Sequence, residues 1–178
     1  MYLKSNGETE ESTKWLEASS KQDYIPAIHQ LAAHLLQLGD KKKSKEAMDL
    51  LHFCAKQEYT DSKLKLIEVF STEGPEKDEK KAQEMILMCA FEGIPEAEYL
   101  LGLYHFNTDD HDEAYKWFLQ ASRKGHLKSI FNLGMFYIDG IGVPADREKG
   151  WSIIKKAADR GDPDSIRFLQ KFNEENKD

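Results

Sequence analysis

The sequence has few of the residues that punctuate β proteins or build disulfide frameworks. Its 178 residues include 5 prolines, 11 glycines and 2 cysteines. So few turn residues exclude a turn-rich β protein or a collagen-like one, and two cysteines do not make a disulfide framework. No apolar run reaches the ~18 residues that a membrane-spanning helix requires. The first residues, MYLKSNGETEEST, contain no apolar signal core.

The chain also lacks an excess of positive charge. Its 25 Lys and Arg residues are outnumbered by 32 Asp and Glu residues, for a net charge of −7. A nucleic-acid binder needs a net basic face, so a nucleic-acid partner is not expected. The hydrophobic fraction of 40%, with 9 Phe, 7 Tyr and 3 Trp, excludes a disordered chain. The composition predicts a soluble, acidic, cytoplasmic globular protein that binds neither nucleic acid nor membrane.

An internal repeat is present. Small residues open a first helix in each copy, at Ala27, Ser62, Ala97, Ser129 and Ser165, and each is followed four residues later by Leu. A second series of small residues, Ser12, Ala47, Ala82, Ala114 and Gly150, opens a second helix. The intervals in both series are 35, 35, 32 and 36 residues. The residues three and seven positions further on are apolar in nearly every copy and share one helix face, so the repeat predicts a helix–turn–helix unit.

Stacking of such units sets the expected architecture. A single helical hairpin cannot bury its apolar face, but stacked copies can. We therefore expect an all-α fold, an α-solenoid of about ten helices, forming a single domain over residues 1–178. The expected divisions are a partial repeat at 1–24, repeats at 25–59, 60–93, 94–125 and 126–161, and a terminal helix at 162–178. The helix at each end of the chain has no partner helix of its own repeat. This is consistent either with end caps of the repeat array or with a fragment of a longer array.

The fourth repeat carries the most specific pattern. Its ordered positions are Ser129, Leu133, Gly134, Tyr137, Gly140, Gly142, Val143, Asp146, Lys149, Gly150, Ile153, Lys156, Ala157, Ala158 and Gly161. This pattern resembles the Sel-one-like repeat family, a relative of the tetratricopeptide repeat, with Gly150 in place of the usual Ala and Ile153 in place of an aromatic. Residues 97–125 match with a shortened loop, whereas residues 12–93 match only in the core columns. The resemblance implies a right-handed superhelix that serves as a protein-binding scaffold and not as an enzyme.

Two loop patterns that suggest ligand binding have a simpler structural interpretation. The Gly-rich segment 140–142 lacks the following Gly-Lys-Ser/Thr and the preceding strand of a phosphate loop, so we predict an interhelix turn with Asp146 capping the next helix. The acidic turn at 109–113 fits a capping box of Asp110 and Glu113, and it lacks the ligand spacing of a calcium loop. No metal and no cofactor are expected.

Catalysis by a Ser-x-x-Lys pair is also not expected. Ser62 with Lys65, and Ser152 with Lys155, have the spacing found in penicillin-recognising enzymes. Neither pair is accompanied by the Ser-Asp-Asn or Lys-Thr-Gly motifs of those enzymes. Both are interpreted as parts of packed helices, and no catalytic residue is assigned.

The two cysteines, Cys54 and Cys89, share one column of the repeat. Equivalent helices of stacked repeats lie at least ~9 Å apart, whereas a disulfide needs Cα atoms within about 7 Å. We expect two buried, reduced thiols, as in a reducing cytosol.

The resemblance also implies where a partner binds. In tetratricopeptide-like arrays the first helices build the concave wall, and positions two, six and nine after the small residue face the ligand. In the third and fourth repeats these positions are all apolar: Tyr99, Leu103, Phe106, Phe131, Met135 and Ile138. Such an apolar centre is typical of a peptide-binding groove. The alternative is that Tyr99, Leu103, Phe131 and Met135 pack between helices, leaving Phe106 and Ile138 as the exposed contacts.

The functional hypothesis is a non-catalytic scaffold or adaptor, monomeric or weakly oligomeric, that binds a partner protein on its concave face. A narrower version is a small acidic inhibitor or immunity protein that neutralises one target, such as a toxin, and meets a basic partner through electrostatic steering. A hypothesis from another class is a hydrolase, such as a β-lactamase-like enzyme, but no set joining a nucleophile to a base is found. A further alternative is a purely structural segment of a longer scaffold.

Overall fold

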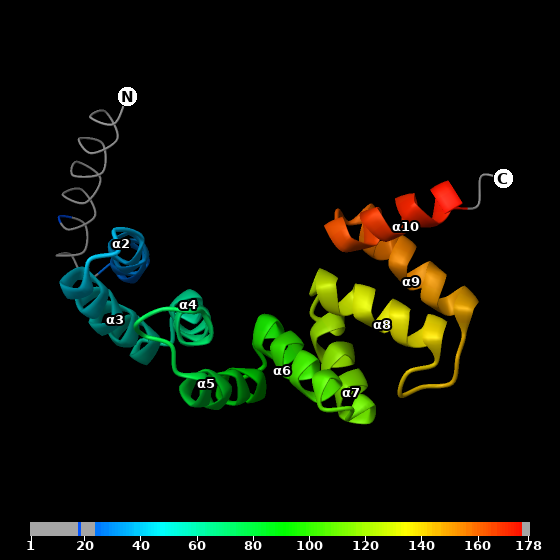
Figure 1. The fold of residues 1–178 in the computed structure, drawn as a ribbon, viewed down its shortest axis with the longest axis horizontal. Helices are drawn as coiled ribbons and strands as arrows, with labels where there is room; N and C mark the ends of the chain where they lie inside the picture. Colours follow the sequence, from blue (N-terminus) through cyan, green and yellow to red (C-terminus); the bar gives the residue numbers. More distant parts are fainter. Residues whose placement is uncertain (1–17, 19–23, 176–178) are drawn as a thin grey trace. The chain divides into compact units, whose positions relative to one another are not determined.

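A computed structural model describes residue 18 and residues 24–175 (Figure 1). These residues form nine α-helices and no strand: α2 (Ile25–Gln37), α3 (Lys41–Lys56), α4 (Thr60–Ser71), α5 (Glu79–Phe91), α6 (Pro95–Asn107), α7 (His111–Arg123), α8 (Leu127–Asp139), α9 (Arg147–Asp159) and α10 (Pro163–Glu175). The all-α class and the repeated helical pairs are confirmed. Apart from Ala18, the second helix expected within the partial repeat 1–24 lies outside the described residues.

The helices fall into two compact units, Met1–Met85 (unit 1) and Ile86–Asp178 (unit 2). In unit 1, α3 packs against both α2 and α4. In unit 2, α6 packs on α7, α7 on α8, α8 on α9, and α10 on α9. The expectation of a single domain over residues 1–178 stays a prediction. Within the described part of the chain, no helix combines the length and apolar character needed to cross a membrane.

In three of the helix pairs, an aspartate side chain caps the N-terminus of the second helix. The carboxylate of Asp40 accepts hydrogen bonds from the backbone N–H groups of Lys42 and Lys43, at 2.9 and 3.0 Å. Asp110 accepts from the N–H of Glu113 at 3.4 Å, and Asp146 from that of Lys149 at 3.0 Å. These bonds satisfy backbone donors that a helix start leaves without a partner. The capping roles predicted for Asp110 and Asp146 are confirmed.

The Gly-rich segment 140–142 is a turn between two helices. Gly140 ends α8 in the left-handed conformation, with φ of 71°, which glycine adopts without the steric cost of a Cβ. The backbone N–H of Asp146 donates to the carbonyl of Tyr137 at 2.7 Å, which closes the turn before α9. The predicted interhelix turn is therefore confirmed.

The core of unit 1 is a cluster of apolar side chains from four helices. Its buried members are Leu31, Ala32, Leu35, Ala47, Met48, Leu51, Leu66, Phe70 and Ala82. Cys54 is fully buried as well, and burial raises the pKa of its thiol. Cys89, in unit 2, is equally buried. The predicted burial of both thiols is confirmed.

The helix pairs of unit 2 approach closely because glycine lies at their contact. A Cβ atom on Gly102 of α6 would meet the ring of Phe118 of α7 at 2.7 Å. A Cβ on Gly134 of α8 would meet the Cγ1 atom of Ile154 of α9 at 2.4 Å. Real Cβ contacts are longer than this, so both pairs depend on the bare glycine backbone. The close approach sets the geometry of the surface that α6 and α8 present together.

Candidate functional site

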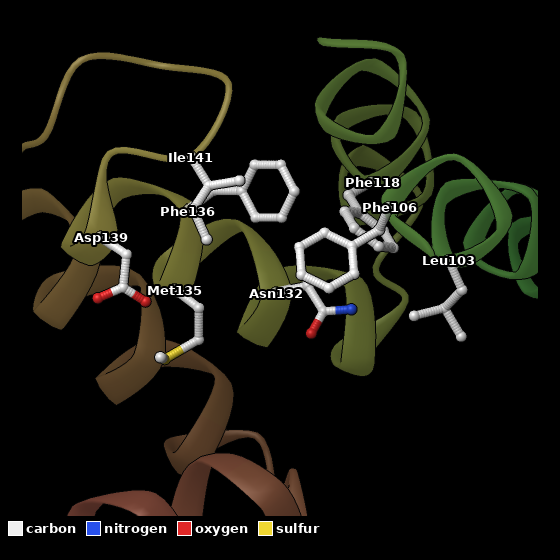
Figure 2. A pocket seen from close by; sticks show the side chains of 8 residues that line it. All are labelled: Leu103, Phe106, Phe118, Asn132, Met135, Phe136, Asp139 and Ile141. Atoms are coloured by element: carbon white, nitrogen blue, oxygen red, sulfur yellow. The ribbon is translucent and has the colours of Figure 1, made fainter. Parts of the chain in front are cut away.

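An apolar groove of about 200 Å³ lies in unit 2 between α6 and α8 (Figure 2). It is lined by Leu103 and Phe106 from α6, Phe118 from α7, Asn132, Met135, Phe136 and Asp139 from α8, and Ile141 from the turn that follows. Side chains three or four residues apart lie on one face of a helix, which is why one stripe of α6 and one of α8 face the same space.

Two buried aromatic rings form the floor of the groove. Phe118 is 1% exposed and Phe136 is 3% exposed. Their ring centroids are 5.6 Å apart with an interplanar angle of 85°, the edge-to-face arrangement that aromatic pairs prefer. Both rings belong to the core cluster that also contains Ala114 and Leu133. The floor is therefore part of the packed core and is preformed.

Phe106 forms one edge of the groove and is 36% exposed. Its ring lies 5.8 Å from that of Phe136 and 5.4 Å from that of His111, measured between centroids. These contacts hold the ring in place while leaving part of its surface to solvent. A side chain placed in this way is suited to contact an apolar group that enters the groove.

The opposite edge is a stripe along α8 formed by Asn132, Met135 and Asp139 (Figure 2). Asp139 is exposed and lies one helical turn from Met135. Among the residues that line the groove there is no Lys or Arg. Asp139 is also the last residue of α8, where the helix dipole is negative. A carboxylate and the negative end of the helix dipole therefore lie together at this end of the groove.

Polar contacts at the start of α6 fix its position against the neighbouring helices. The ammonium of Lys124 donates to the buried carboxylate of Glu98 at 2.5 Å and to the carbonyl of Gly93 at 2.7 Å. The ring of His126 bridges Glu96, at 2.8 Å from Nε2, and the hydroxyl of Ser129, at 2.9 Å from Nδ1.

The bridge at His126 joins α6 to α8. The ring accepts a hydrogen bond at Nδ1 from the backbone N–H of Ser129, so Nε2 carries a proton and donates it to the carboxylate of Glu96. This bond holds the pKa of Glu96 below its ordinary value of 4.5. It connects the beginnings of the two helices whose later residues line the groove.

Three of the six residues predicted from the sequence line this groove, namely Leu103, Phe106 and Met135. The other three predicted residues, Tyr99, Phe131 and Ile138, pack elsewhere. The ring of Tyr99 lies 4.8 Å from that of His126 and 6.0 Å from that of Phe118, between centroids. Burial raises the pKa of the Tyr99 hydroxyl.

Phe131 and Ile138 face the C-terminal helices. The ring of Phe131 meets that of Phe168 on α10 edge to face, with 5.9 Å between centroids. The Cγ1 atom of Ile138 lies 2.6 Å from the position that a Cβ on Gly150 would occupy, so Ile138 covers the backbone of α9. Ile138 is half-buried there, and substituting it would disturb the pairing of α8 with α9.

The sequence reasoning missed five lining residues, namely Phe118, Asn132, Phe136, Asp139 and Ile141. A helical stripe through Met135 continues equally well along 131 and 138 or along 132 and 139, because both spacings fit the helical period. The structure has the second stripe facing the groove. The repeat pattern favours the first stripe, whereas the polar side chains of Asn132 and Asp139 are the feature of the sequence that marks the second stripe.

The Ser-x-x-Lys motif in unit 1 does not form an accessible nucleophilic site. Ser62 is fully buried, and its hydroxyl lies 2.9 Å from Nδ1 of His29. Lys65 instead bonds both carboxylate oxygens of Glu68, at 2.8 and 2.9 Å. Burial lowers the pKa of His29. The Ser62–His29 contact therefore joins α4 to α2 inside the packed unit.

A second polar cluster lies beside the turn after α8. The hydroxyls of Tyr115 and Tyr137 are 2.7 Å apart, and the ammonium of Lys149 lies 3.9 Å from the centroid of the Tyr137 ring. Burial and the bond to Tyr137 raise the pKa of Tyr115 to about 12. The bond from Lys149 lowers that of Tyr137. In the described part of the chain, no three His, Cys, Asp or Glu side chains are placed to hold a metal ion.

Paired helices stacked side by side, with an apolar groove between two first helices, define a helical-repeat protein. Two consecutive segments, residues 95–126 and 127–162, match the family model described as the Sel1 repeat. Residues 95–162 of this chain are therefore two Sel1-like repeats. Sel1 repeat proteins generally mediate protein–protein interactions, and the family is typically non-enzymatic.

Similar proteins with solved structures share the fold. A Sel1 repeat protein from Oxalobacter formigenes has a TM-score of 0.76 at 23% identity, covering 90% of this chain and 68% of that one. A protective antigen of uropathogenic Escherichia coli that displays an SLR fold has a TM-score of 0.72 at 27% identity, covering 88% and 35%. Cysteine-rich protein B of Helicobacter pylori has a TM-score of 0.56 at 17% identity, covering 73% and 98%.

Among curated proteins, the chain resembles the chitin synthase regulator SKT5 of Saccharomyces cerevisiae. The two are 38% identical over 74 residues, which is 42% of this chain. The matched segment spans only 11% of the length of SKT5.

Proposed function

We propose that this chain is a non-catalytic interaction module that binds a segment of a partner protein in the groove between α6 and α8. The observation that carries the proposal is a groove with a buried aromatic floor, Phe118 and Phe136, and a partly exposed aromatic edge, Phe106. Aromatic and Met side chains around a preformed apolar pocket are the usual anchors of a protein interface.

The size of the groove supports a polypeptide partner over a small molecule. Pockets for drug-sized ligands and cofactors are commonly ~300–1,000 Å³ and enclose most of the ligand. The groove is smaller, at about 200 Å³. A volume of this size accommodates a large apolar side chain while the rest of the partner segment lies across α6 and α8.

Site-specific photo-cross-linking in cells that make the protein tests this proposal. A photoreactive amino acid at Asn132, inside the groove, is compared with the same amino acid at Gln120, which is exposed on α7 outside it. The proposal expects a discrete cross-linked protein from position 132 and none from position 120. The captured protein is then purified, and its binding to the full chain is measured directly.

Matched substitutions show whether the groove carries the binding. Phe106→Glu and Met135→Glu place a charge in the groove and are expected to abolish binding. Phe91→Glu is the control, because Phe91 is 74% exposed on α5 and does not line the groove. Circular dichroism checks that each variant is folded. Equal cross-linking from positions 132 and 120, or full binding by folded Phe106→Glu and Met135→Glu, would contradict the proposal.

A further inference from the structure

The α8 edge of the groove combines an apolar contact with a single carboxylate. Met135 lies inside the groove, and Asp139 follows it by one helical turn along the same stripe (Figure 2). Asp139 is exposed, and no Lys or Arg side chain is among the residues that line the groove. A charged group in this position favours a partner of opposite charge and disfavours one of the same charge.

We infer that the segment bound in this groove carries a basic side chain next to its apolar anchor, and that Asp139 pairs with that basic side chain. This inference rests on the proposed function and specifies the chemistry of the partner segment. The negative end of the α8 dipole, at the same place, acts in the same direction as the carboxylate. A neutral or acidic segment would leave Asp139 without a counter-charge when bound.

The spacing of Met135 and Asp139 constrains the spacing in the partner. Side chains one helical turn apart have Cβ atoms ~5–6 Å apart. An extended segment presents alternate side chains on one face, and these are separated by ~6.6 Å. A helical segment presents residues three or four apart at a matching separation. The anchor and the basic residue are therefore expected two positions apart in an extended segment, or three to four apart in a helical one.

The two contacts contribute differently to recognition. The apolar anchor on Phe118 and Phe136 removes surface from water and supplies most of the affinity. The pair at Asp139 is partly hydrated, and exposed ion pairs change affinity by about fivefold or less. Asp139 is therefore a specificity-determining residue, which selects among segments that share the same anchor.

Selection from a phage-displayed library of random peptides on the immobilised full chain tests the inference. Enriched peptides are expected to contain Leu, Met or Phe followed or preceded by Arg or Lys at one of the spacings above. Synthetic versions are then titrated by fluorescence anisotropy. Asp139→Asn is expected to weaken binding about three- to fivefold, and Asp139→Lys about tenfold or more.

Two comparisons make the test specific to Asp139. Glu148→Gln removes another exposed carboxylate, at the start of α9 and outside the groove, and is expected to leave binding unchanged. A peptide with Glu in place of its basic residue is expected to regain binding to Asp139→Lys. Rescue of this kind requires that the two side chains face each other in the complex.

The outcomes separate this inference from the proposed function. Peptides that lose binding to Phe106→Glu, but show no basic preference and bind Asp139→Asn normally, would overturn the inference and leave the proposed function standing. Enriched peptides that are acidic would also overturn it. Peptides that bind the Phe106→Glu and Met135→Glu variants normally would show that the groove is not the docking site, and both would fail.

Discussion

The helix pair α2–α3 in unit 1 and the pairs α6–α7 and α8–α9 in unit 2 solve the same packing problem with opposite distributions of volume. In unit 2 the first helix has glycine after its repeated Leu, and the second helix places a large side chain on that bare backbone. Phe118 lies on Gly102 in this way, and Ile154 lies on Gly134. In unit 1 the residue that corresponds to these glycines is Ala32, and the residue that corresponds to Phe118 is Leu51. Both are fully buried and belong to one core cluster.

For Gly102 with Phe118 and Ala32 with Leu51, the summed volume of the two side chains is nearly the same, so a smaller residue on the first helix accompanies a larger one on the second. Close-packed interiors tolerate exchanges that conserve volume better than those that change it. Glycine opposite Phe and alanine opposite Leu are two ways to fill the same contact. Both glycines of unit 2 lie within residues 95–162, which the family model matches.

The largest effect is expected from Gly134→Ala, which breaks the arrangement of unit 2. The added methyl would meet Ile154 at 2.4 Å and the carbonyl oxygen of Gly150 at 3.1 Å. Ile154 is fully buried and a backbone oxygen cannot rotate away, so overpacking of this kind costs about 2–3 kcal/mol. Urea denaturation followed by circular dichroism measures the free energy of unfolding.

The control for Gly134→Ala is Gly74→Ala in unit 1. A Cβ at Gly74 has nothing within 4 Å, so its effect is expected to stay within ~0.5 kcal/mol, as for most surface substitutions. Similar losses from the two variants would show that the glycine contact does not hold α8 and α9 together.

Most of the fold could be predicted from the sequence because the determinants of helical hairpins are local and repeated. Small residues recurring at fixed intervals, and Asp110 and Asp146 as caps, each act within one or two helical turns. The exact division into domains depends on how helices of different repeats pack against one another. The residues at single repeat positions do not determine this packing. The residue series could not show that α5 begins in one compact unit and ends in the other.

The groove was predictable only in part. Leu103, Phe106 and Met135 are predicted from the resemblance to tetratricopeptide-like repeats, in which first helices form the wall that faces the ligand. Asp139 was missed, because a rotation of α8 by one residue exchanges one stripe for the next, and periodicity does not resolve that rotation. Phe118 and Phe136, which form the floor, occupy core positions of the repeat. The sequence pattern indicates that such residues are buried, but it does not show which edge of a buried ring borders a groove.

A smaller loss of stability is expected when the Gly–Phe pair of α6 and α7 is converted to the Ala–Leu pair found in unit 1. Gly102→Ala would push on the Phe118 ring at 2.7 Å and is expected to cost about 1–2 kcal/mol. Phe118→Leu alone leaves space and costs about 1 kcal/mol. The double variant recreates the pairing of Ala32 with Leu51, so its loss should be below the sum by about 0.5 kcal/mol or more.

The reverse exchange is the matched control for this cycle. Ala32→Gly and Leu51→Phe are each expected to destabilise unit 1, and the double variant to recover part of the loss. Free energies of unfolding from urea titration give both coupling energies. Strict additivity in both cycles would mean that the two facing positions do not share one volume, which would remove the basis of the comparison.

The smallest effect is a difference in how the two units respond to acid. Unit 1 links α2 to α4 through His29 and Ser62, whereas unit 2 links α6 to α8 through Glu96 and His126. Both His29 and Glu96 have a lowered pKa in the folded state, from 6.5 and 4.5 respectively, so in each case the unfolded chain binds the proton first as pH falls. The contribution of His29 is present above pH 6.5 and lost as pH falls through its lowered pKa, and that of Glu96 is present above pH 4.5 and lost at lower pH.

Urea midpoints measured across this range should show two separate losses, the first absent in His29→Gln and the second absent in Glu96→Gln. His52→Gln, an exposed histidine of α3, should retain both, and a first loss that persists in His29→Gln would place the acid-sensitive group of unit 1 elsewhere.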